Sequence, residues 1–545
     1  MRKKLLLGLL LACCSIGVAI AQSVTITGKV TGDKGAPLAG VTVQEKNSKI
    51  ATVSDDGGLY RISVKSGATL VFSSVGYKKA EFTVNGTTLN VSLKQEDASL
   101  SEVVVTSFGQ SSSKKRLSSS VVDVKADQLA QKSEPDILRA LQGKVPGVTV
   151  VGGGGAPGQS SKINIRGITS FSGNNQPLIV VDGIPFDNSV NQSAGFDANT
   201  VFSNRLYDVD PNNIESMTVL KGANAAALYG SRATNGVILI TTKKGKSGAP
   251  KYAFSSQLSV SNVTKKLDVF SADEIRDIVK TKGPSYTSLL GNASTDWQDE
   301  IYQTAITTDN NISVSGAYKK LPYRFSLGNL MQSGILRSDK LNRTTVGVNV
   351  SPTLFDNHLT LNVNYKLAAS KTNFADQGAI GAATYFDPTK PVYSGTQAYN
   401  GYWNWTDPTS SNGLRALAPK NPLGILLDKD DQSNVTRHIA NAVVDYKVHF
   451  IPDLHVVVNT GMDVAEGKGT IMINDQAATT YMRFKDAAGK FHSGVNNEYR
   501  QTRNNTYLNA YLNYTKEIPF LSTRVELTGG YEYQNYLTTN YNFAD

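Results

Sequence analysis

The chain has 545 residues, of which 40% are hydrophobic and 18% charged, so it is long enough for several domains and is not disordered in composition. Its two cysteines, Cys13 and Cys14, lie near the amino terminus, which excludes disulfides, cysteine nucleophiles and cysteine metal sites from the rest of the chain. The formal net charge is +10, but it is spread along the chain without a basic block, so no nucleic-acid partner is expected.

Residues 1–21 have the pattern of a secretory signal peptide. Three basic residues, Arg2 to Lys4, precede an apolar run through Ile20, and Ala-Ile-Ala stands before Gln22 as a small-residue cleavage site. Lipoprotein processing at Cys13 is an alternative, but the apolar run continues past that position. We therefore expect cleavage before Gln22 and export. No later apolar run is long enough for a transmembrane helix.

Residues 22–97 are predicted to form a small β-sandwich. Short alternating runs, such as Val24 to Val30 and Tyr60 to Val64, are separated by turn residues. Asp55 and Asp56 stand before two glycines, which is typical of a hairpin turn and a weaker match to a calcium site.

Residues 98–115 are predicted to be a linker that carries one β-branched run, composed of Glu102, Val103, Val104, Val105 and Thr106. An isolated run of this kind has no sheet of its own, so it is suited to strand addition to another protein, in which main-chain hydrogen bonds give the affinity. The alternative is that it forms the last strand of the preceding sandwich.

Residues 116–246 are predicted to form a mixed α/β domain. Asp210 and Pro211 are an N-cap and first-turn pair that opens a short helical turn through Glu215. Strands are expected over Met217–Leu220 and Val237–Ile240, the second buried on both faces, and a helix over Ala223–Leu228.

The earlier half of this domain has the same mixed pattern. A helix is expected to open at Ser133 to Asp136 and to run through Leu141. Strands are expected over Val148–Val151, Ile163–Ile165 and Pro177–Pro185. The glycine-rich loop from Gly152 to Gly158 is interrupted by proline and leads into a strand. It therefore lacks the helix that a dinucleotide site requires, and no cofactor is expected.

Residues 247–545 alternate polar and apolar side chains with a period of two. In the clearest run, apolar Leu359 to Leu367 alternates with polar Thr360 to Lys366. A soluble sandwich face is one interpretation. The length of the runs, their terminal tyrosines and the polar second face favour an outer-membrane β-barrel with lipid outside and water inside.

Roughly nine or ten strands fit this region, whereas a barrel that holds a plug needs about 22. An open sheet edge in lipid would cost several kcal/mol for each unpaired backbone group. We therefore expect the chain to be the amino-terminal part of a longer protein, with residues 247–545 as a partial barrel.

Catalytic and metal-binding patterns do not stand out in the sequence. The five histidines are scattered, and the nearest pair, His449 and His455, is separated by Pro452 without an acidic ligand at metal spacing. No nucleophile elbow, zinc-protease motif or paired acids are present, so we expect neither an enzyme nor a metal site.

Several blocks of residues 116–246 resemble the plug domain of TonB-dependent outer-membrane transporters of the SusC/RagA type. They read L-Q-G-K-V-P-G-V-T-V, I-N-I-R-G, P-L-I-V-V-D-G-I-P and I-E-S-M-T-V-L-K-G-A-N-A-A-A-L-Y-G-S-R-A-T-N-G-V-I-L-I-T-T-K-K-G. Residues 22–97 are similar to the carboxypeptidase-regulatory-like domain that precedes such plugs, a name that implies no peptidase activity. Glu102 to Thr106 looks like the TonB box, although Ser107-Phe108-Gly109 departs from the family's Gly-Tyr-Gly.

This resemblance implies a mainly β protein in the outer membrane of a Gram-negative bacterium that actively imports oligosaccharides or oligopeptides. Its implied partners are TonB with the ExbB/ExbD energising complex and a SusD/RagB-like lid lipoprotein. Four aromatic residues of a long loop, Tyr399, Tyr402, Trp403 and Trp405, are candidates to stack on sugars, or else to pack on the lid or at the membrane interface. The alternative function is a surface receptor or adhesin that transports nothing, which would not need the strand at residues 102–106.

Overall fold

The computed structural model describes residues 23–32, 35–46, 48, 50–65, 67–74, 77, 79–84, 86–93, 103–105, 111–113, 121–129, 136–152, 155–158, 161–168, 170–171, 175–186, 205–222, 229–319, 321–486, 488–518 and 523–545. The chain divides into two compact units, Met1–Val104 with Ser111–Arg116, and Val105–Gln110 with Leu117–Asp545.

The first unit contains two small sheets that share one hydrophobic core. The three-stranded sheet has the order β4-β1-β7 and the four-stranded sheet the order β3-β2-β5-β6. The ring of Tyr60 on β4 contacts the ring of Phe72 on β5 at 5.3 Å, so aromatic packing joins the two sheets. The predicted sandwich is confirmed. The strand bounds are β1 Ser23–Gly32, β2 Thr42–Glu45, β3 Ala51–Val53, β4 Leu59–Lys65, β5 Thr69–Ser73, β6 Ala80–Thr83 and β7 Val91–Leu93.

A separate two-stranded sheet follows, in which β8 (Val103–Val105) pairs with β9 (Ser111–Ser113). Within the described ranges, β8 has no partner among the strands of the sandwich. The alternative in which residues 103–105 complete the sandwich is therefore not what the structure contains.

The plug, as we call the described residues from β10 to β16, is built on a five-stranded sheet with the order β10-β15-β16-β13-β14 and a separate β11-β12 hairpin. Its central strand β16 is buried along most of its length, as the all-apolar run at Val237–Ile240 predicts. The strand bounds are β10 Val121–Lys125, β11 Val148–Val151, β12 Lys162–Ile165, β13 Leu178–Val181, β14 Ile184–Phe186, β15 Ile214–Leu220 and β16 Val237–Thr242.

The helices of the plug are shorter than the sequence predicts. Asp210 does cap a turn, but this is a single 3-10 turn, and β15 begins at once because the side chain of Ile214 is buried in the plug core. In the described part of the segment predicted as a helix to Leu141, residues 136–141, only Arg139–Leu141 are helical. The predicted helix Ala223–Leu228 lies outside the described residues. The bounds are α2 Ala126–Leu129, η3 Arg139–Leu141, η4 Arg205–Asp208, η5 Pro211–Asn213 and η6 Ser231–Ala233.

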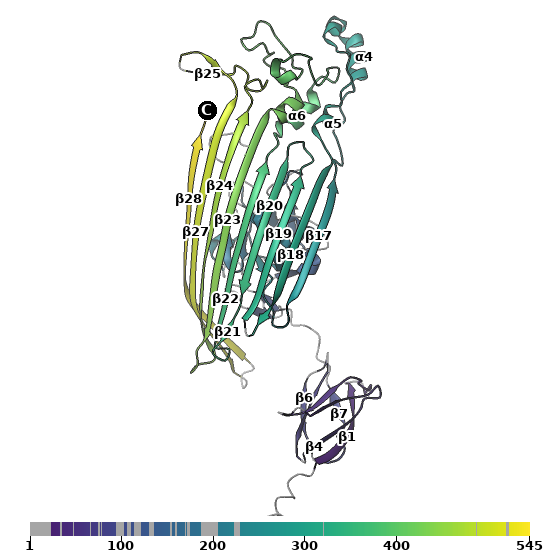
Figure 1. The fold of residues 1–545 in the computed structure, drawn as a ribbon, viewed down its shortest axis with the longest axis vertical. Helices are drawn as coiled ribbons and strands as arrows, with labels where there is room; N and C mark the ends of the chain where they lie inside the picture. The colour runs from purple at the N-terminus through teal and green to yellow at the C-terminus, as the bar shows by residue number, and fades with distance from the viewer. Residues whose placement is uncertain are drawn as a thin grey trace, which may run out of the picture. The chain divides into compact units, whose positions relative to one another are not determined.

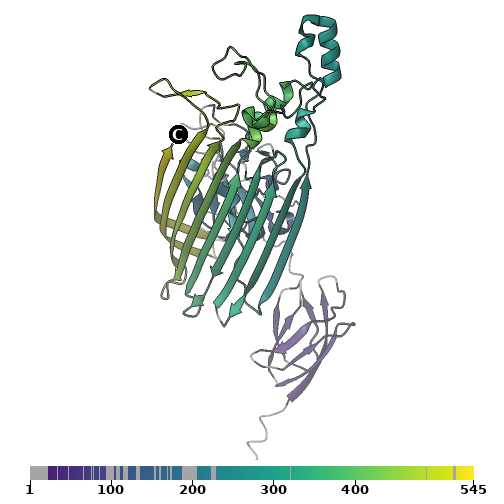
Figure 2. The ribbon, with the colours of Figure 1, turned by 45° about the horizontal axis from the view of Figure 1, so that its top comes forward.

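The wall, as we call the sheet from β17 to β28, is a ten-stranded antiparallel sheet in which chain order and spatial order agree. Figure 1 shows its long strands side by side, and Figure 2 shows the plug strands, in blue, lying against one face of the sheet. The strand number agrees with the sequence prediction for this region. The bounds are β17 Lys251–Ser261, β18 Ala305–Tyr318, β19 Leu321–Ser333, β20 Lys340–Val350, β21 Thr353–Leu354, β22 Leu359–Asn373, β23 Lys429–Lys447, β24 Leu454–Ile473, β27 Val495–Ile518 and β28 Thr523–Phe543.

Long connections lie at one end of the wall, the loop end, and include residues 262–304, 374–428 and 474–494. The connections at the other end, the turn end, are short, such as residues 448–453. The helices of the loop end gather at the top of both views. Their bounds, with those of two short strands, are α4 Ala272–Lys282, η7 Pro284–Leu289, α5 Trp297–Ile301, α6 Gly378–Tyr385, η8 Ala398–Gly401, α7 Pro422–Leu427, β25 Phe484–Lys485 and β26 Phe491–His492.

None of the helices in the described part of the chain is both long enough and apolar enough to cross a membrane.

Candidate functional site: the interface between plug and wall

The most completely buried charge in the interface is Arg437, at the middle of β23, with 1% of its side chain exposed. Its Nε and Nη2 atoms donate to the two carboxylate oxygens of Asp463 on β24, at 2.7 and 2.8 Å. Its Nη1 atom donates to Asp208 of the plug at 3.1 Å, and the guanidinium lies 4.5 Å above the ring of Phe186. Asp463 of the wall therefore binds the arginine in a bidentate ion pair, and the same arginine binds Asp208 of the plug.

A second charged contact joins Lys366, on β22, to Asp182 in the turn between β13 and β14. The same carboxylate accepts hydrogen bonds from the backbone nitrogen and hydroxyl of Thr242, at 2.9 and 2.8 Å. Burial raises the pKa of Asp182, but the opposing effects of Lys366 and Thr242 are larger together, so its pKa lies below the ordinary value. The carboxylate therefore stays ionised against the wall.

The predicted cap residue, Asp210, also contacts the wall. One of its carboxylate oxygens accepts from the backbone nitrogen of Asn212 at 2.9 Å. The other accepts from Asn311 on β18 at 2.7 Å and from Thr345 on β20 at 3.3 Å. Gly328 on β19 leaves room for this approach, because a Cβ atom there would lie 2.6 Å from the carboxylate oxygen.

Hydrophobic packing is organised differently from these polar contacts. The large plug core is built almost entirely from plug residues, and the wall contributes only Ile439 and Tyr507 to it among the described residues. The remaining contacts between plug and wall include hydrogen bonds such as Arg324 to Asn213 at 3.0 Å and the Gly245 nitrogen to Asn349 at 2.9 Å. The plug thus carries its own core and meets the wall through these polar groups and through small apolar contacts, among them Tyr207 of the plug with Leu330 and Leu341 of the wall.

The predicted TonB-binding residues are only partly described. Val103, Val104 and Val105 form β8, whereas Glu102 and Thr106 lie outside the described residues. Because β8 pairs only with β9 in the described part of the chain, one of its edges is not used by another described strand. The assignment of these five residues to TonB binding stays a prediction.

The four predicted aromatic residues do lie close together at the loop end, but they are packed against neighbours. Tyr402 is 8% exposed and stacks on Tyr393 at 5.5 Å between ring centres. Burial raises its pKa to about 12. The Tyr399 hydroxyl donates to the Asn412 carbonyl at 3.1 Å, and burial raises the pKa of this tyrosine as well.

The two tryptophans pack edge to face at 5.0 Å. The Lys390 ammonium lies over both rings, 4.8 Å from Trp403 and 4.7 Å from Trp405. Trp403 also packs against the small core around Phe386. Much of this aromatic surface is therefore used inside the loop, and the role of these residues in ligand binding stays a prediction.

The histidines are arranged in pairs with other side chains. His358 and His449 stack with 3.8 Å between ring centres, and His455 bonds to Asp445 at 2.7 Å. Among the described residues, no three histidine, cysteine, aspartate or glutamate side chains are placed to hold a metal ion.

Sequence reasoning missed the charged residues that join plug and wall, namely Asp182, Asp208, Arg437 and Asp463. The two residues of each contact between plug and wall are far apart in the chain, so their spacing in the sequence does not predict the contact. One available indication was the alternation on β22, which places Lys366 on the polar face. A charge in the middle of a long alternating strand, such as Arg437, indicates in the same way a residue that needs a buried partner.

Comparisons with known proteins agree with this architecture. Residues 113–237 match the TonB-dependent Receptor Plug Domain, and residues 26–105 match the CarboxypepD_reg-like domain. The TonB-dependent receptor SusC of Bacteroides thetaiotaomicron is 38% identical over 513 residues, which cover 92% of this chain and 49% of that protein. TonB-dependent receptor P3 of Formosa agariphila is 31% identical over 530 residues, which cover 94% of this chain and 48% of that protein.

Among solved structures, the RagAB peptide importer in its open-open state is similar, with a TM-score of 0.61 and 21% identity. The match covers 81% of this chain and 50% of that one. The chain spans about half the length of the curated relatives it matches. The relatives named here are receptors and an importer, in agreement with the expectation that the chain is not an enzyme. Over nearly all of its length the chain is similar to TonB-dependent receptors, SusC among them, and it carries both the plug domain and the CarboxypepD_reg-like domain.

Proposed function

We propose that the protein is an active importer of the bacterial outer membrane, in which the plug closes the passage and TonB displaces or remodels it. The observation that carries this proposal is the character of the contact between plug and wall. A plug that holds its own core, and that meets the wall through polar groups and small apolar contacts, is able to separate from it without exposing that core.

The strand β8 supplies the proposed point of attachment. Strand addition requires an edge whose main-chain groups are available, and in a two-stranded sheet each strand keeps one such edge. TonB, energised by ExbB and ExbD, would add a strand to Glu102–Thr106 on the periplasmic side. Force transmitted along the chain would then reach the plug, which begins at β10.

The proposed cargo is an oligosaccharide or an oligopeptide, captured at the loop end with a SusD/RagB-like lipoprotein as a lid. The peptide alternative is supported by the similarity to RagAB, which is named as a peptide importer. The sugar alternative is supported by the aromatic cluster of Tyr399, Tyr402, Trp403 and Trp405, although its packing leaves Tyr402 little surface to offer.

Deletion of residues 102–106 tests the mechanism. Uptake of the cognate nutrient should fall to the level of a TonB-null strain, while binding of that nutrient to the cell surface should persist. The control deletes five residues that precede the strand, Glu96 to Leu100, so that the chain shortens equally while residues 102–106 are kept. Unchanged uptake after loss of residues 102–106 would contradict import driven through this strand. It would be expected if the protein is a surface receptor or adhesin and another transporter carries the nutrient.

A further inference from the structure

The outward face of the wall changes character along its strands. Arg437 and Lys366 face the plug, so the residues at alternate positions on the same strands face away from it. On β24 the outward side chains from Leu454 to Val464 are apolar except for Thr460. Beyond Val464, toward the loop end, the outward side chains become Glu466, Lys468 and Thr470.

The length of the apolar part matches a membrane. A transmembrane strand needs about 9–11 residues to cross the hydrocarbon layer. The apolar outward run on β24 from Leu454 to Val464 falls in that range, as does the run on β22 from Leu359 to Ala369. The polar outward residues therefore begin where the hydrocarbon would end, at the level of the lipid headgroups on the loop side.

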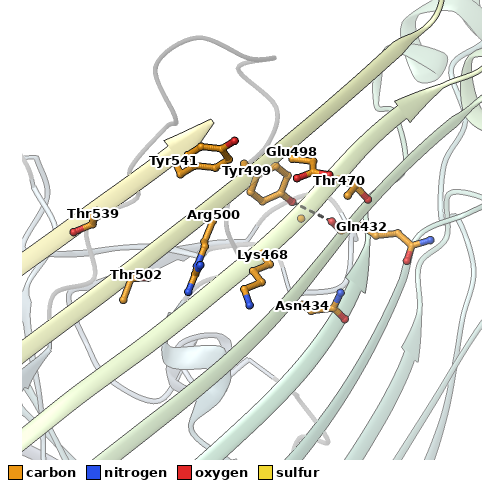
Figure 3. Close-up of a pocket in the computed structure, with 11 residues that line it drawn as sticks. Gln432, Asn434, Lys468, Thr470, Glu498, Tyr499, Arg500, Thr502, Thr539 and Tyr541 are labelled. Atoms are coloured by element: carbon orange, nitrogen blue, oxygen red, sulfur yellow. Dashed lines mark hydrogen bonds between the residues drawn. The ribbon is translucent and has the colours of Figure 1, made fainter. Parts of the chain in front are cut away.

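One row of cross-strand neighbours at this level carries three cations. The register places Lys371 beside Asn434, Asn434 beside Lys468, Lys468 beside Arg500, and Arg500 beside Tyr541. Figure 3 shows Asn434, Lys468 and Arg500 next to one another on three neighbouring strands. A tyrosine in this row is typical of the aromatic girdle at a membrane interface.

The row borders a hollow of about 660 Å³ that opens to the outside. Both cations at its centre are accessible, since 61% of the Lys468 side chain and 52% of the Arg500 side chain are exposed. Glu466 forms an ion pair with each of them, since one of its carboxylate oxygens lies 3.0 Å from the lysine ammonium and 2.8 Å from the arginine guanidinium. Glu498 lines the side of the hollow nearer the loops.

We propose that Lys468 and Arg500 bind a phosphate group of a phosphorylated glycolipid in the outer leaflet. This inference rests on the proposed placement in the outer membrane. One glutamate uses only part of the eight N–H donors that an arginine and a lysine offer together. Arginine fits a phosphate with two parallel hydrogen bonds, and lysine adds a point charge beside it. Asn434 and Thr502, which line the same hollow, can bond the sugar hydroxyls next to the phosphate.

The test measures lipid binding to the detergent-purified protein by native mass spectrometry. The probes are bisphosphorylated lipid A, dephosphorylated lipid A of the same acyl composition, and inorganic phosphate. The variant is the double substitution Lys468→Gln and Arg500→Gln. The matched control is Lys516→Gln on the same strand as Arg500, since its side chain is also 52% exposed and pairs with a single carboxylate, Asp453, at the turn end.

We expect the double variant to bind bisphosphorylated lipid A at least about tenfold more weakly, because two charge-assisted contacts are lost. The control should bind like the wild type, and dephosphorylated lipid A should bind weakly to all three proteins. Equal binding of lipid A by the double variant and the wild type would overturn the proposal. Equal binding of the two lipids would also overturn it, because the phosphate would then contribute nothing. If inorganic phosphate displaces lipid A at an equal concentration, the ligand of this site is a free anion and the lipid proposal is overturned.

Uptake measured on the same variants separates this inference from the proposed function. A double variant that loses lipid A binding but still imports leaves both proposals standing. A wild-type protein that binds lipid A through these residues but shows no TonB-dependent uptake would refute the import proposal alone.

Discussion

The ion pair between Arg437 and Asp208 gives the sharpest test of how the wall holds the plug. In an Asp208→Asn variant, Arg437 keeps its two-pronged pair with Asp463, so the wall should stay intact while the plug loses one charge-assisted contact. A hydrogen bond to a charged group contributes about 1.5–3 kcal/mol, which corresponds to about 10- to 150-fold in the equilibrium between a seated and an open plug.

Substitution of the other partner, Arg437, should destabilise the protein more. Arg437→Gln leaves the carboxylates of Asp208 and Asp463 buried without their cation, and removal of one partner of a buried pair costs about 3–5 kcal/mol. The loss should affect β23 and β24 as well as the plug, because Asp463 belongs to the wall.

Hydrogen exchange followed by mass spectrometry distinguishes the two variants. Asp208→Asn should speed amide exchange in plug residues 205–220 by about tenfold or more, with little change in β23 and β24. The control, Asp123→Asn, removes the same charge from a carboxylate that accepts a hydrogen bond from Thr218 inside the plug. It should change exchange in β15 but not in residues 205–213, which include Asp208. Exchange in Asp208→Asn that matches the wild type would show that this ion pair does not hold the plug, and the reasoning from buried charge would be refuted.

Three further predictions concern other parts of the chain. Burial raises the pKa of Asp339, in the loop before β20, to about 7, so its folded form holds a proton that the unfolded form releases near pH 4. Its contribution to stability should therefore be largest below pH 4 and be lost as the pH rises to 7, and Asp339→Asn should remove this dependence in thermal melts between pH 4 and 8. Val104→Pro removes a strand N–H and should abolish TonB-dependent uptake, whereas Val104→Thr should retain it; equal uptake by both would argue against strand addition. Tyr402→Ala should lower the free energy of unfolding of the loop end by about 3–5 kcal/mol, because a buried ring is removed. Trp405→Ala should lower ligand affinity more than stability, because the Trp405 side chain is partly exposed.

The local pattern of the sequence predicted much of the fold for clear physical reasons. Period-two alternation identified long strands such as β22, because one face of the wall meets the polar plug interface and the other is apolar over the length of a membrane. The capping role of Asp210 followed from its own neighbours. The helix expected to end at Leu141 was too long, because tertiary packing of that short segment outweighed its helical propensity.

The contacts of the candidate site could not be predicted in the same way. Asp208 and Arg437 are 229 residues apart, and a pairing at that distance is set by how the plug seats on the wall. The exposure of the aromatic side chains in the loop was equally unpredictable. It depends on the packing of Lys390 over the two tryptophans and of Tyr393 against Tyr402. One sequence contains the residues of such contacts but not their pairing.

The inner face of the wall is rich in neutral amides, including buried Asn349, Asn364, Asn441 and Asn509. Carboxamide groups both donate and accept hydrogen bonds, so water can replace the plug at these positions bond for bond. A wall that the plug has left would therefore be wettable at once, without further rearrangement of the strands. Because these amides carry no net charge, the positions that they occupy would hydrate a polar solute without retaining ions, and charge on this face stays at separate positions such as Lys366 and Arg437.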